Sequence, residues 1–171
     1  MRYFLIVGRI VGFKGVDLAI EAAKKLDVNL KVVGEYAGIY TEQEKIKRIV
    51  NDKIELLGRV SDEELKKLYL GATAFLALAK DEDFGMTPVE AMAAGCPVVA
   101  YKSGGYLETV VEGKTGTFFS EYNVESLVTA MKKITKMKIK KEDCQKQANK
   151  FSKEIFIKKM KEVVNAGITR S

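Results

Sequence analysis

The sequence contains no histidine among its 171 residues. Histidine is the most common general base and the most common metal ligand in proteins, and the serine and cysteine catalytic relays depend on it. Its absence excludes those relays within this chain. Any chemistry here must use carboxylates, lysine, arginine and backbone dipoles, or a histidine that another chain supplies.

Cysteines and long apolar runs are also scarce. The two cysteines, Cys96 and Cys144, do not have the spacing of metal ligands, so we expect reduced thiols and a cytoplasmic location. No apolar run approaches the roughly 20 residues that a membrane-spanning helix needs. The first residues, Met1–Tyr3, do not resemble the start of a signal peptide. We therefore expect at most a peripheral position at the inner face of the membrane.

Positive charge is concentrated near the C-terminus. The net charge is +6, and residues 131–162 hold 12 lysines against 4 acidic residues. Such a run is most often a solvated helix face, and the alternative is a surface that docks on a partner chain or an anionic membrane. The run has few interleaved aromatic residues, which argues against nucleic-acid binding.

Apolar segments alternate with amphipathic segments along the chain. Strands that are apolar on both faces and alternate with helices favour a parallel sheet covered by helices on both sides. We predict an α/β, Rossmann-like three-layer domain with about six parallel strands and additional C-terminal helices, spanning residues 1–171 as a single domain. The predicted strands are 3–7, 30–33, 54–57, 73–78, 98–101 and 117–119. The predicted helices are 16–26, 41–50, one from 61, 87–94, 123–136, 141–150 and 153–165.

Capping boxes indicate where two of these helices begin. Thr41 is followed three residues later by Glu44, and Ser61 is followed by Glu64 at the same spacing. In a capping box each of the two side chains bonds the backbone amide of the other residue. We therefore predict that helices begin at these two positions.

Ligands of open parallel sheets bind beyond the carboxyl ends of the strands. The loop after Val7 contains Arg9 and Lys14 between a strand and a helix, where cations and helix amides can bind phosphate oxygens. The loop has neither the Walker A spacing nor the dinucleotide-binding glycine pattern. Taken alone, it is explained slightly better as a solvated turn with two exposed cations.

The segment Glu82–Glu90 has the most informative pattern. Thr87 suits the N-cap of a helix, Pro88 its first position and Glu90 its third, so Glu90 has a structural role available as a capping residue. The preceding loop, Asp83–Met86, brings the free amides of that helix to the sheet edge, and Gly85 allows a ligand to approach the backbone closely.

Two other interpretations of the same carboxylates are less favourable. Asp81-Glu82-Asp83 resembles an acidic metal-binding triplet, but no second cluster of ligands accompanies it, so we predict no metal site. Glu82 and Glu90 could form a glycosidase pair. The place of Glu90 in the first turn of a helix argues against the free positioning that such a pair needs.

Together these segments resemble the C-terminal domain of retaining glycosyltransferases of family four, which have the GT-B fold. The resemblance runs from about residue 3 to about residue 135. It departs from the family pattern at Gly34–Gly38, where a glycine-and-proline turn is usual, and at Ala79-Lys80, where Pro-Ser is usual. The matching segments are Val7-Gly8-Arg9, Lys14-Gly15, Val32-Val33-Gly34, Leu57-Gly58-Arg59-Val60-Ser61, Glu82-Asp83-Phe84-Gly85, Pro88–Val99, Gly104-Gly105 with Glu108, and Gly113-Lys114-Thr115-Gly116.

The resemblance implies a role for each matching site residue. Arg9 and Lys14 would bind the donor diphosphate and stabilise charge on the leaving group, and Glu82 would lie beside the donor sugar; these three are the implied catalytic residues. Glu90 would bind the ribose hydroxyls, overriding or sharing its capping role. The family generally needs no metal or other cofactor. The implied donor-binding residues are Gly8, Arg59, Val60, Phe84, Gly85, Met86, Thr87 and Glu90.

A complete GT-B enzyme also has an N-terminal domain that holds the acceptor, often with a histidine. None of that domain matches here. The resemblance therefore predicts the nucleotide-sugar-binding half of a hexosyltransferase, such as a mannosyl- or glucosyltransferase, which transfers little or nothing without an N-terminal domain in cis or on a separate chain. The alternative is a non-catalytic assembly module whose basic helices, 131–162, dock a partner chain or an anionic membrane.

Overall fold

The computed structural model describes residues 2–37, 44, 46 and 48–168. Six parallel strands form one sheet in the order β3-β2-β1-β4-β5-β6, which confirms the predicted Rossmann-like α/β fold. The strands are β1 (Tyr3–Val7), β2 (Asn29–Val33), β3 (Ile54–Gly58), β4 (Ala74–Ala77), β5 (Val98–Tyr101) and β6 (Gly116–Phe119).

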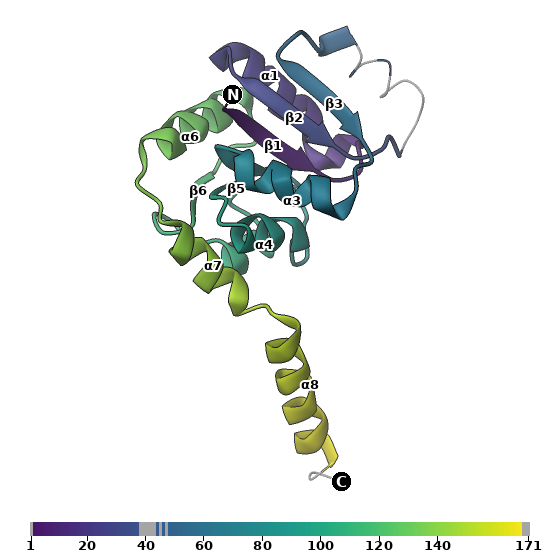
Figure 1. Cartoon of the computed structure of the whole chain (residues 1–171), viewed down its shortest axis with the longest axis vertical. Helices are drawn as coiled ribbons and strands as arrows, with labels where there is room; N and C mark the ends of the chain where they lie inside the picture. The colour runs from purple at the N-terminus through teal and green to yellow at the C-terminus, as the bar shows by residue number, and fades with distance from the viewer. Residues whose placement is uncertain (1, 38–43, 45, 47, 169–171) are drawn as a thin grey trace.

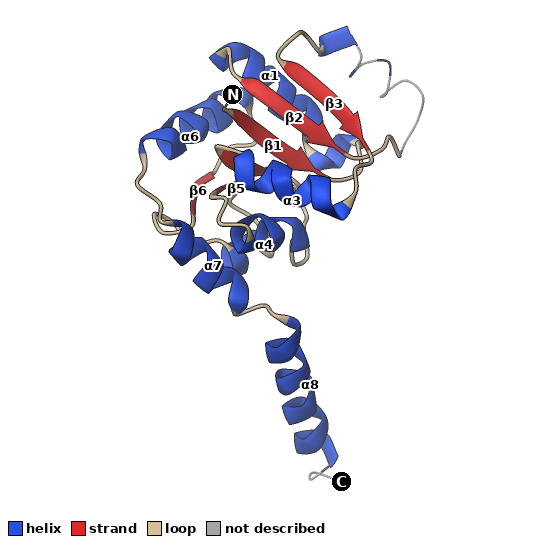
Figure 2. Cartoon of the chain, viewed as in Figure 1, coloured by secondary structure: helices blue, strands red, loops and turns tan. Residues whose placement is uncertain are grey.

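Helices cover both faces of the sheet, as Figures 1 and 2 show. One face packs against α1 (Val16–Leu26) and α6 (Val124–Lys136), which also contact each other. The other face packs against α3 (Asp62–Gly71), α4 (Met86–Ala93) and α7 (Lys141–Asn149).

The alternation of side chains along β1 explains the two layers. Phe4 and Ile6 belong to the apolar cluster on the α1 face, whereas Leu5 belongs to the cluster on the α4 face. Successive side chains of a strand point to opposite faces, so a continuous apolar run serves both layers at once. All three side chains are at most 4% exposed.

The register of the strands places the ends of β1, β2 and β3 side by side. Val7 pairs with Val33, and the amide of Gly34 donates to the carbonyl of Gly58 at 2.8 Å. A Cβ on Gly34 would lie 1.9 Å from the carbonyl oxygen of Gly8. Only glycine permits this close approach of the first two loops.

Several predicted boundaries need adjustment. The Ser61–Glu64 capping box is present at the start of α3, whereas the predicted helix start at Thr41 lies outside the described residues. Two short helices were not predicted: the 3-10 helix η1 (Gly12–Lys14) and α5 (Tyr106–Thr109). They are single turns within loops, too short to produce a hydrophobic period.

The C-terminal helix α8 (Lys153–Ile168) extends away from the rest of the molecule (Figures 1 and 2). Its side chains from 153 to 166 are all exposed. No helix within the described part of the chain is long and apolar enough to cross a bilayer.

Candidate functional site

A cavity of about 370 Å³ opens at the carboxyl ends of β1 and β4. The order of the sheet reverses between these two strands, and crevices at such a position are the usual ligand sites of open α/β sheets. Most of the predicted site residues line the cavity, namely Gly8, Arg9, Lys14, Glu82, Phe84, Gly85, Met86 and Thr87.

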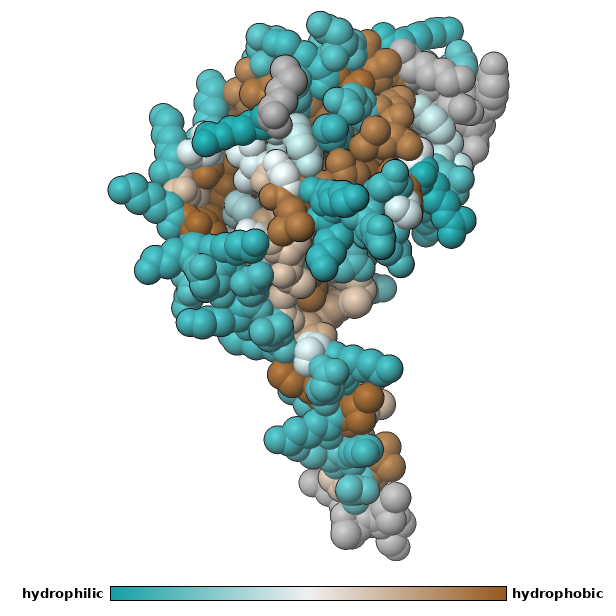
Figure 3. All heavy atoms as spheres, in the orientation of Figure 1, coloured by the Kyte–Doolittle hydropathy of each residue, from teal (hydrophilic) through white to brown (hydrophobic). Residues whose placement is uncertain are grey.

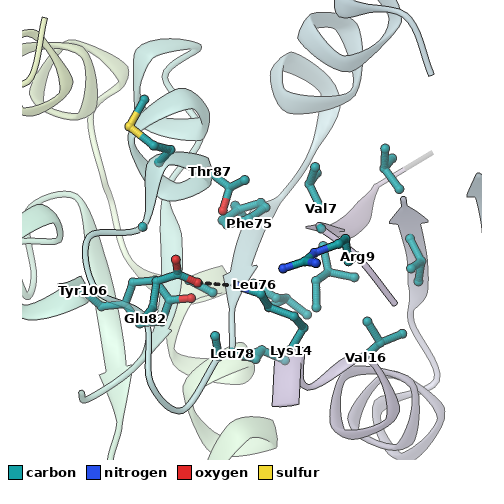
Figure 4. Close-up of a pocket in the computed structure, with 18 of the residues that line it drawn as sticks. Val7, Arg9, Lys14, Val16, Phe75, Leu76, Leu78, Glu82, Thr87 and Tyr106 are labelled. Carbon is teal, nitrogen blue, oxygen red and sulfur yellow. Dashed lines mark hydrogen bonds and ion pairs between the residues drawn. The ribbon is translucent and has the colours of Figure 1, made fainter. Parts of the chain in front are cut away.

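The loop after β1 contributes the positive charge. Arg9 is exposed and points toward the space between β1 and α4, as Figure 4 shows. Lys14 ends η1, and its ammonium group reaches the same cavity. Both cations therefore reach the cavity from the loop that follows β1.

The loop before α4 lies across the cavity from Arg9. Gly85 is the N-cap of α4, in a left-handed conformation with a φ of 80°, and no side chain caps the helix. A Cβ at Gly85 would lie 2.8 Å from the ring of Tyr106, so this turn requires glycine. The amides of Gly85, Met86 and Thr87 have no intrahelical acceptors because they stand at the start of the helix, and Pro88, at its third position, has no N–H. Such amides attract an anion.

The predicted capping box at Thr87 is wrong. The N-cap is Gly85, two residues before the predicted N-cap, so Thr87 occupies the second position of the helix and Pro88 the third. Glu90 therefore lies beyond the position from which a capping side chain reaches back. The left-handed turn at Gly85, which lies close to the ring of Tyr106, precedes this start, and the local pattern did not predict that turn.

An ion pair joins the two loops across the cavity. The Nζ atom of Lys14 lies 2.6 Å from Oε2 of Glu82, and each side chain is about a quarter exposed, at 26% and 25%. Figure 4 draws this contact as a dashed line. The pair brings together the two charged side chains for which the resemblance implies diphosphate binding and sugar binding.

Tyr106 was not among the predicted site residues, yet it lines the cavity. Burial, together with the nearby Glu82 carboxylate, raises the pKa of Tyr106 well above its usual value. The amide of Gly105 donates to the carbonyl of Glu82 at 2.8 Å, so the paired-glycine turn supports the acidic loop. The sequence signal for Tyr106 was its place directly after that turn.

Glu90 lies outside this cavity and lines a neighbouring groove between α3 and α4, with a volume of about 470 Å³. Its Oε2 atom accepts a hydrogen bond of 3.1 Å from the hydroxyl of Tyr69, a residue that the sequence interpretation missed. Glu90 follows Thr87 by about one helical turn, so one elongated ligand could contact both.

The loop after β3 contains the remaining predicted residues. Arg59 is exposed and Val60 is partly buried, and neither lines the cavity of Arg9. Because β3 and β1 run parallel, this loop lies at the same edge of the sheet. Within the described ranges, no group of three or more Cys, Asp or Glu side chains could hold a metal ion.

Known proteins show similarity over most of the chain. A family model described as Glycosyl transferases group 1 matches residues 1–151. An uncharacterized glycosyltransferase of Methanocaldococcus jannaschii is 35% identical over 129 residues, covering 74% of this chain and 36% of that protein. Mannosylfructose-phosphate synthase of Agrobacterium fabrum is 32% identical over 146 residues, covering 77% of this chain and 32% of that protein.

The fold has counterparts among solved structures. Anabaena HepE in complex with UDP-glucose superposes with a TM-score of 0.83 at 22% identity, covering 96% of this chain and 48% of that chain. At this identity the superposition shows a shared fold alone. The chain spans about a third of the length of the curated relatives it matches, at 36% and 32%.

Proposed function

The chain belongs to the glycosyl transferases group 1 family, and we propose that it is the donor-binding half of a retaining GT-B glycosyltransferase. Its substrate in this proposal is a nucleoside-diphosphate sugar. One observation carries the proposal: two cations of one loop and the uncapped N-terminus of α4 meet in one cavity. Both are phosphate-binding devices, and the cavity volume of about 370 Å³ suits a small ligand.

The diphosphate would lie between Arg9 and the N-terminus of α4. Arginine forms two parallel hydrogen bonds with phosphate oxygens, and the amides of Met86 and Thr87 supply donors from the other side. These groups would stabilise the negative charge that develops on the leaving diphosphate. Because side-chain cations and a helix terminus take this role, we propose that no metal or other cofactor is required.

Lys14 and Glu82 would divide their roles when the donor binds. In the structure the Lys14 ammonium lies 2.6 Å from Oε2 of Glu82. Diphosphate oxygens would compete with this carboxylate for the ammonium. Once Lys14 turns to phosphate, Glu82 is free to accept hydrogen bonds from sugar hydroxyls. We propose a hexosyl group, such as mannosyl or glucosyl, as the transferred sugar, and the mannosylfructose-phosphate synthase relative supports this choice.

The nucleoside would extend along α4 toward Glu90 and the loop after β3. Glu90 is exposed and lies beside an open groove, where its carboxylate can accept hydrogen bonds from ribose hydroxyls. The backbone of Arg59 and Val60 would then contact the base. This extended pose assigns a contact to five of the predicted donor-binding residues, and the other three, Gly8, Phe84 and Gly85, line the cavity that would hold the diphosphate.

The exposed face of α8 supports a partner for this domain. Phe156, Met160, Val163 and Val164 are 62%, 47%, 67% and 53% exposed, and their spacing places them on one side of the helix. Figure 3 shows hydrophobic side chains along α8 between hydrophilic ones. We propose that this face packs against an N-terminal, acceptor-binding domain, in cis or on a separate chain, without which transfer is negligible.

The same helix favours a second candidate function. Lys158, Lys159 and Lys161 accompany the apolar face, and an amphipathic helix with lysines can lie on an anionic bilayer. In that case the chain is a non-catalytic assembly module at the inner face of the membrane. The two functions differ in whether the cavity of Arg9 binds a donor.

Calorimetric titration with nucleoside-diphosphate sugars tests the leading proposal. We expect binding, and we expect Arg9→Ala or Lys14→Ala to weaken it by about 1–3 kcal/mol, because each change removes a charge-assisted contact with diphosphate. Lys114→Ala is the matched control. It removes the same charge from the turn before β6, at the opposite edge of the sheet. A folded chain that binds no donor at millimolar concentration, or an equal effect of all three changes, contradicts the proposal.

A further inference from the structure

Tyr69 lines the groove beside Glu90, yet the residue is almost completely buried. It is 4% exposed, and its ring packs edge-to-face on Phe75 of β4, with 5.8 Å between centroids and an interplanar angle of 62°. Its hydroxyl group is directed to one partner, Oε2 of Glu90, at 3.1 Å. The ring is therefore fixed by the core, while the hydroxyl reaches an exposed carboxylate.

The hydrogen bond has a defined direction. Burial, together with the Glu90 carboxylate, raises the pKa of Tyr69 far above the physiological range, so the phenol stays protonated. An ionised carboxylate can only accept hydrogen bonds. The phenol is therefore the donor and Oε2 the acceptor in this bond, which leaves Oε1 of Glu90 available to a ligand donor.

This bond restricts the position of a side chain that would otherwise be free. Glu90 is exposed on α4, and the structure gives it no capping role, because the helix begins at Met86. A free glutamate loses rotamer entropy when it binds a ligand, and this loss weakens binding. A carboxylate that is already held by a rigid phenol has lost much of that freedom before the ligand arrives.

We propose that Tyr69 is a positioning residue that holds the Glu90 carboxylate ready to accept a hydrogen bond from the ribose of the donor nucleotide. Tyr69 itself does not touch the ligand. It converts an exposed, flexible glutamate into a preorganised acceptor, so that the site distinguishes ribose from deoxyribose. The inference rests on the proposed function, since it needs a nucleotide that extends from the cavity of Arg9 to Glu90.

The alternative is that Tyr69 serves packing alone. Phenylalanine would then fill the same place against Phe75, and loss of the hydroxyl would affect stability without affecting the preference for ribose. The chain offers a matched control for this alternative. Tyr3 packs beneath the same helix, and its hydroxyl donates to the carbonyl of Leu68 at 2.8 Å, one residue from Tyr69.

The experiment is a set of calorimetric titrations of the full chain. ADP, GDP and UDP are compared first, and the tightest ligand is then compared with its 2′-deoxy and 3′-deoxy counterparts. The variants are Tyr69→Phe, Tyr3→Phe and Glu90→Gln. The measured quantity is the ratio of the affinities for the ribose and deoxyribose forms, which does not depend on the fraction of folded protein.

We expect the unaltered chain to prefer the ribose form and Tyr69→Phe to reduce that ratio by roughly three- to tenfold. Tyr3→Phe keeps the ratio of the unaltered chain, and Glu90→Gln lowers it at least as far as Tyr69→Phe. This pattern supports the positioning role. An unchanged ratio in Tyr69→Phe, or an equal fall in Tyr3→Phe, overturns it.

Failure of the underlying proposal gives a different result. If the unaltered, folded chain binds no nucleoside diphosphate, the proposed function itself is overturned, and the inference about Tyr69 falls with it. If the chain binds a nucleoside diphosphate without preferring ribose, donor binding stands, but the roles of Glu90 and Tyr69 are overturned.

Discussion

At the scale of residues, the site depends on pairs that lie far apart in the sequence. Lys14 and Glu82 are separated by 68 positions, and Tyr69 and Glu90 by 21. In both pairs one member is a carboxylate that the resemblance had singled out. The partner determines what that carboxylate can do before a ligand arrives: Glu82 is occupied by an ammonium, and Glu90 is held by a phenol.

From the Lys14–Glu82 ion pair we predict how Glu82→Gln changes the affinity for a nucleoside diphosphate. The negative charge of Glu82 repels the donor diphosphate and occupies Lys14, so its removal should tighten the binding of a nucleoside diphosphate without sugar by about fivefold, or about 1 kcal/mol. Calorimetry with the nucleoside diphosphate measures this change. Glu142→Gln, on the exposed first turn of α7, removes the same charge as a control.

If Glu82 only stabilised the diphosphate site, Glu82→Gln would weaken the binding of a nucleoside diphosphate instead of tightening it. A result in which Glu82→Gln weakens nucleoside diphosphate binding while Glu142→Gln does not would mean that the carboxylate stabilises the diphosphate site. Competition for Lys14 would then not limit binding. The affinity for a nucleotide sugar should rise less in Glu82→Gln than the affinity for the nucleoside diphosphate, because Glu82 also contacts the sugar in our proposal.

At the scale of elements, Glu112 connects β6 to α6. Its carboxylate accepts hydrogen bonds from the Thr117 hydroxyl at 2.9 Å, from the Phe118 amide at 2.9 Å and from Lys133 at 2.8 Å. Burial alone would raise the pKa of Glu112, but these donors outweigh it and hold the pKa below its usual value. The folded state therefore favours the ionised carboxylate.

Acid titration of stability tests this connection. A depressed folded-state pKa contributes stability that is present above the unfolded pKa, and that contribution is lost as the pH falls through the folded value. We expect Glu112→Gln to lower the free energy of unfolding by about 1 kcal/mol at pH 7, since the side chain is 47% exposed, and by less as the pH falls below about 4. Urea denaturation at several pH values measures the difference. A pH-independent deficit would instead indicate a loss of packing.

At the scale of the whole molecule, α8 extends away from the sheet and its covering helices, with its side chains from 153 to 166 exposed. We expect the double change Phe156→Ser and Val163→Ser to leave donor affinity within about twofold and the melting temperature within about 2 °C, because the two side chains are 62% and 67% exposed. Calorimetry and thermal denaturation measure these quantities. A large fall in melting temperature would mean that α8 packs on the body of the molecule in solution.

The same variant separates the two possible occupants of the α8 face. Co-sedimentation with vesicles that contain phosphatidylglycerol, at physiological salt, measures membrane docking directly. Salt-sensitive binding that the double variant loses, in a chain that binds no donor, would favour the assembly module. Donor binding without vesicle binding favours the packing of α8 against an acceptor-binding domain.

The sequence by itself determined the layers of the sheet and most of the cavity lining. Hydrophobic periods and capping boxes are local patterns of sequence. The apolar run at Tyr3–Val7 therefore predicted a strand, and the capping box at Ser61 predicted the start of a helix. The loops follow, because parallel strands bring their carboxyl ends to one edge. Arg9, Lys14 and Glu82 could therefore be placed at one edge of the sheet from the sequence, whereas the strand order that sets β1 beside β4 comes from the structure.

Only the tertiary structure decided how the carboxylates are held. The N-cap of α4 is Gly85 instead of Thr87, and Gly85 turns close to the ring of Tyr106, a proximity that no local pattern records. That shift removed the capping role of Glu90 and left its carboxylate to Tyr69. Such contacts join residues that are distant in the sequence, so they depend on how the helices pack on the sheet and cannot be read from a local pattern.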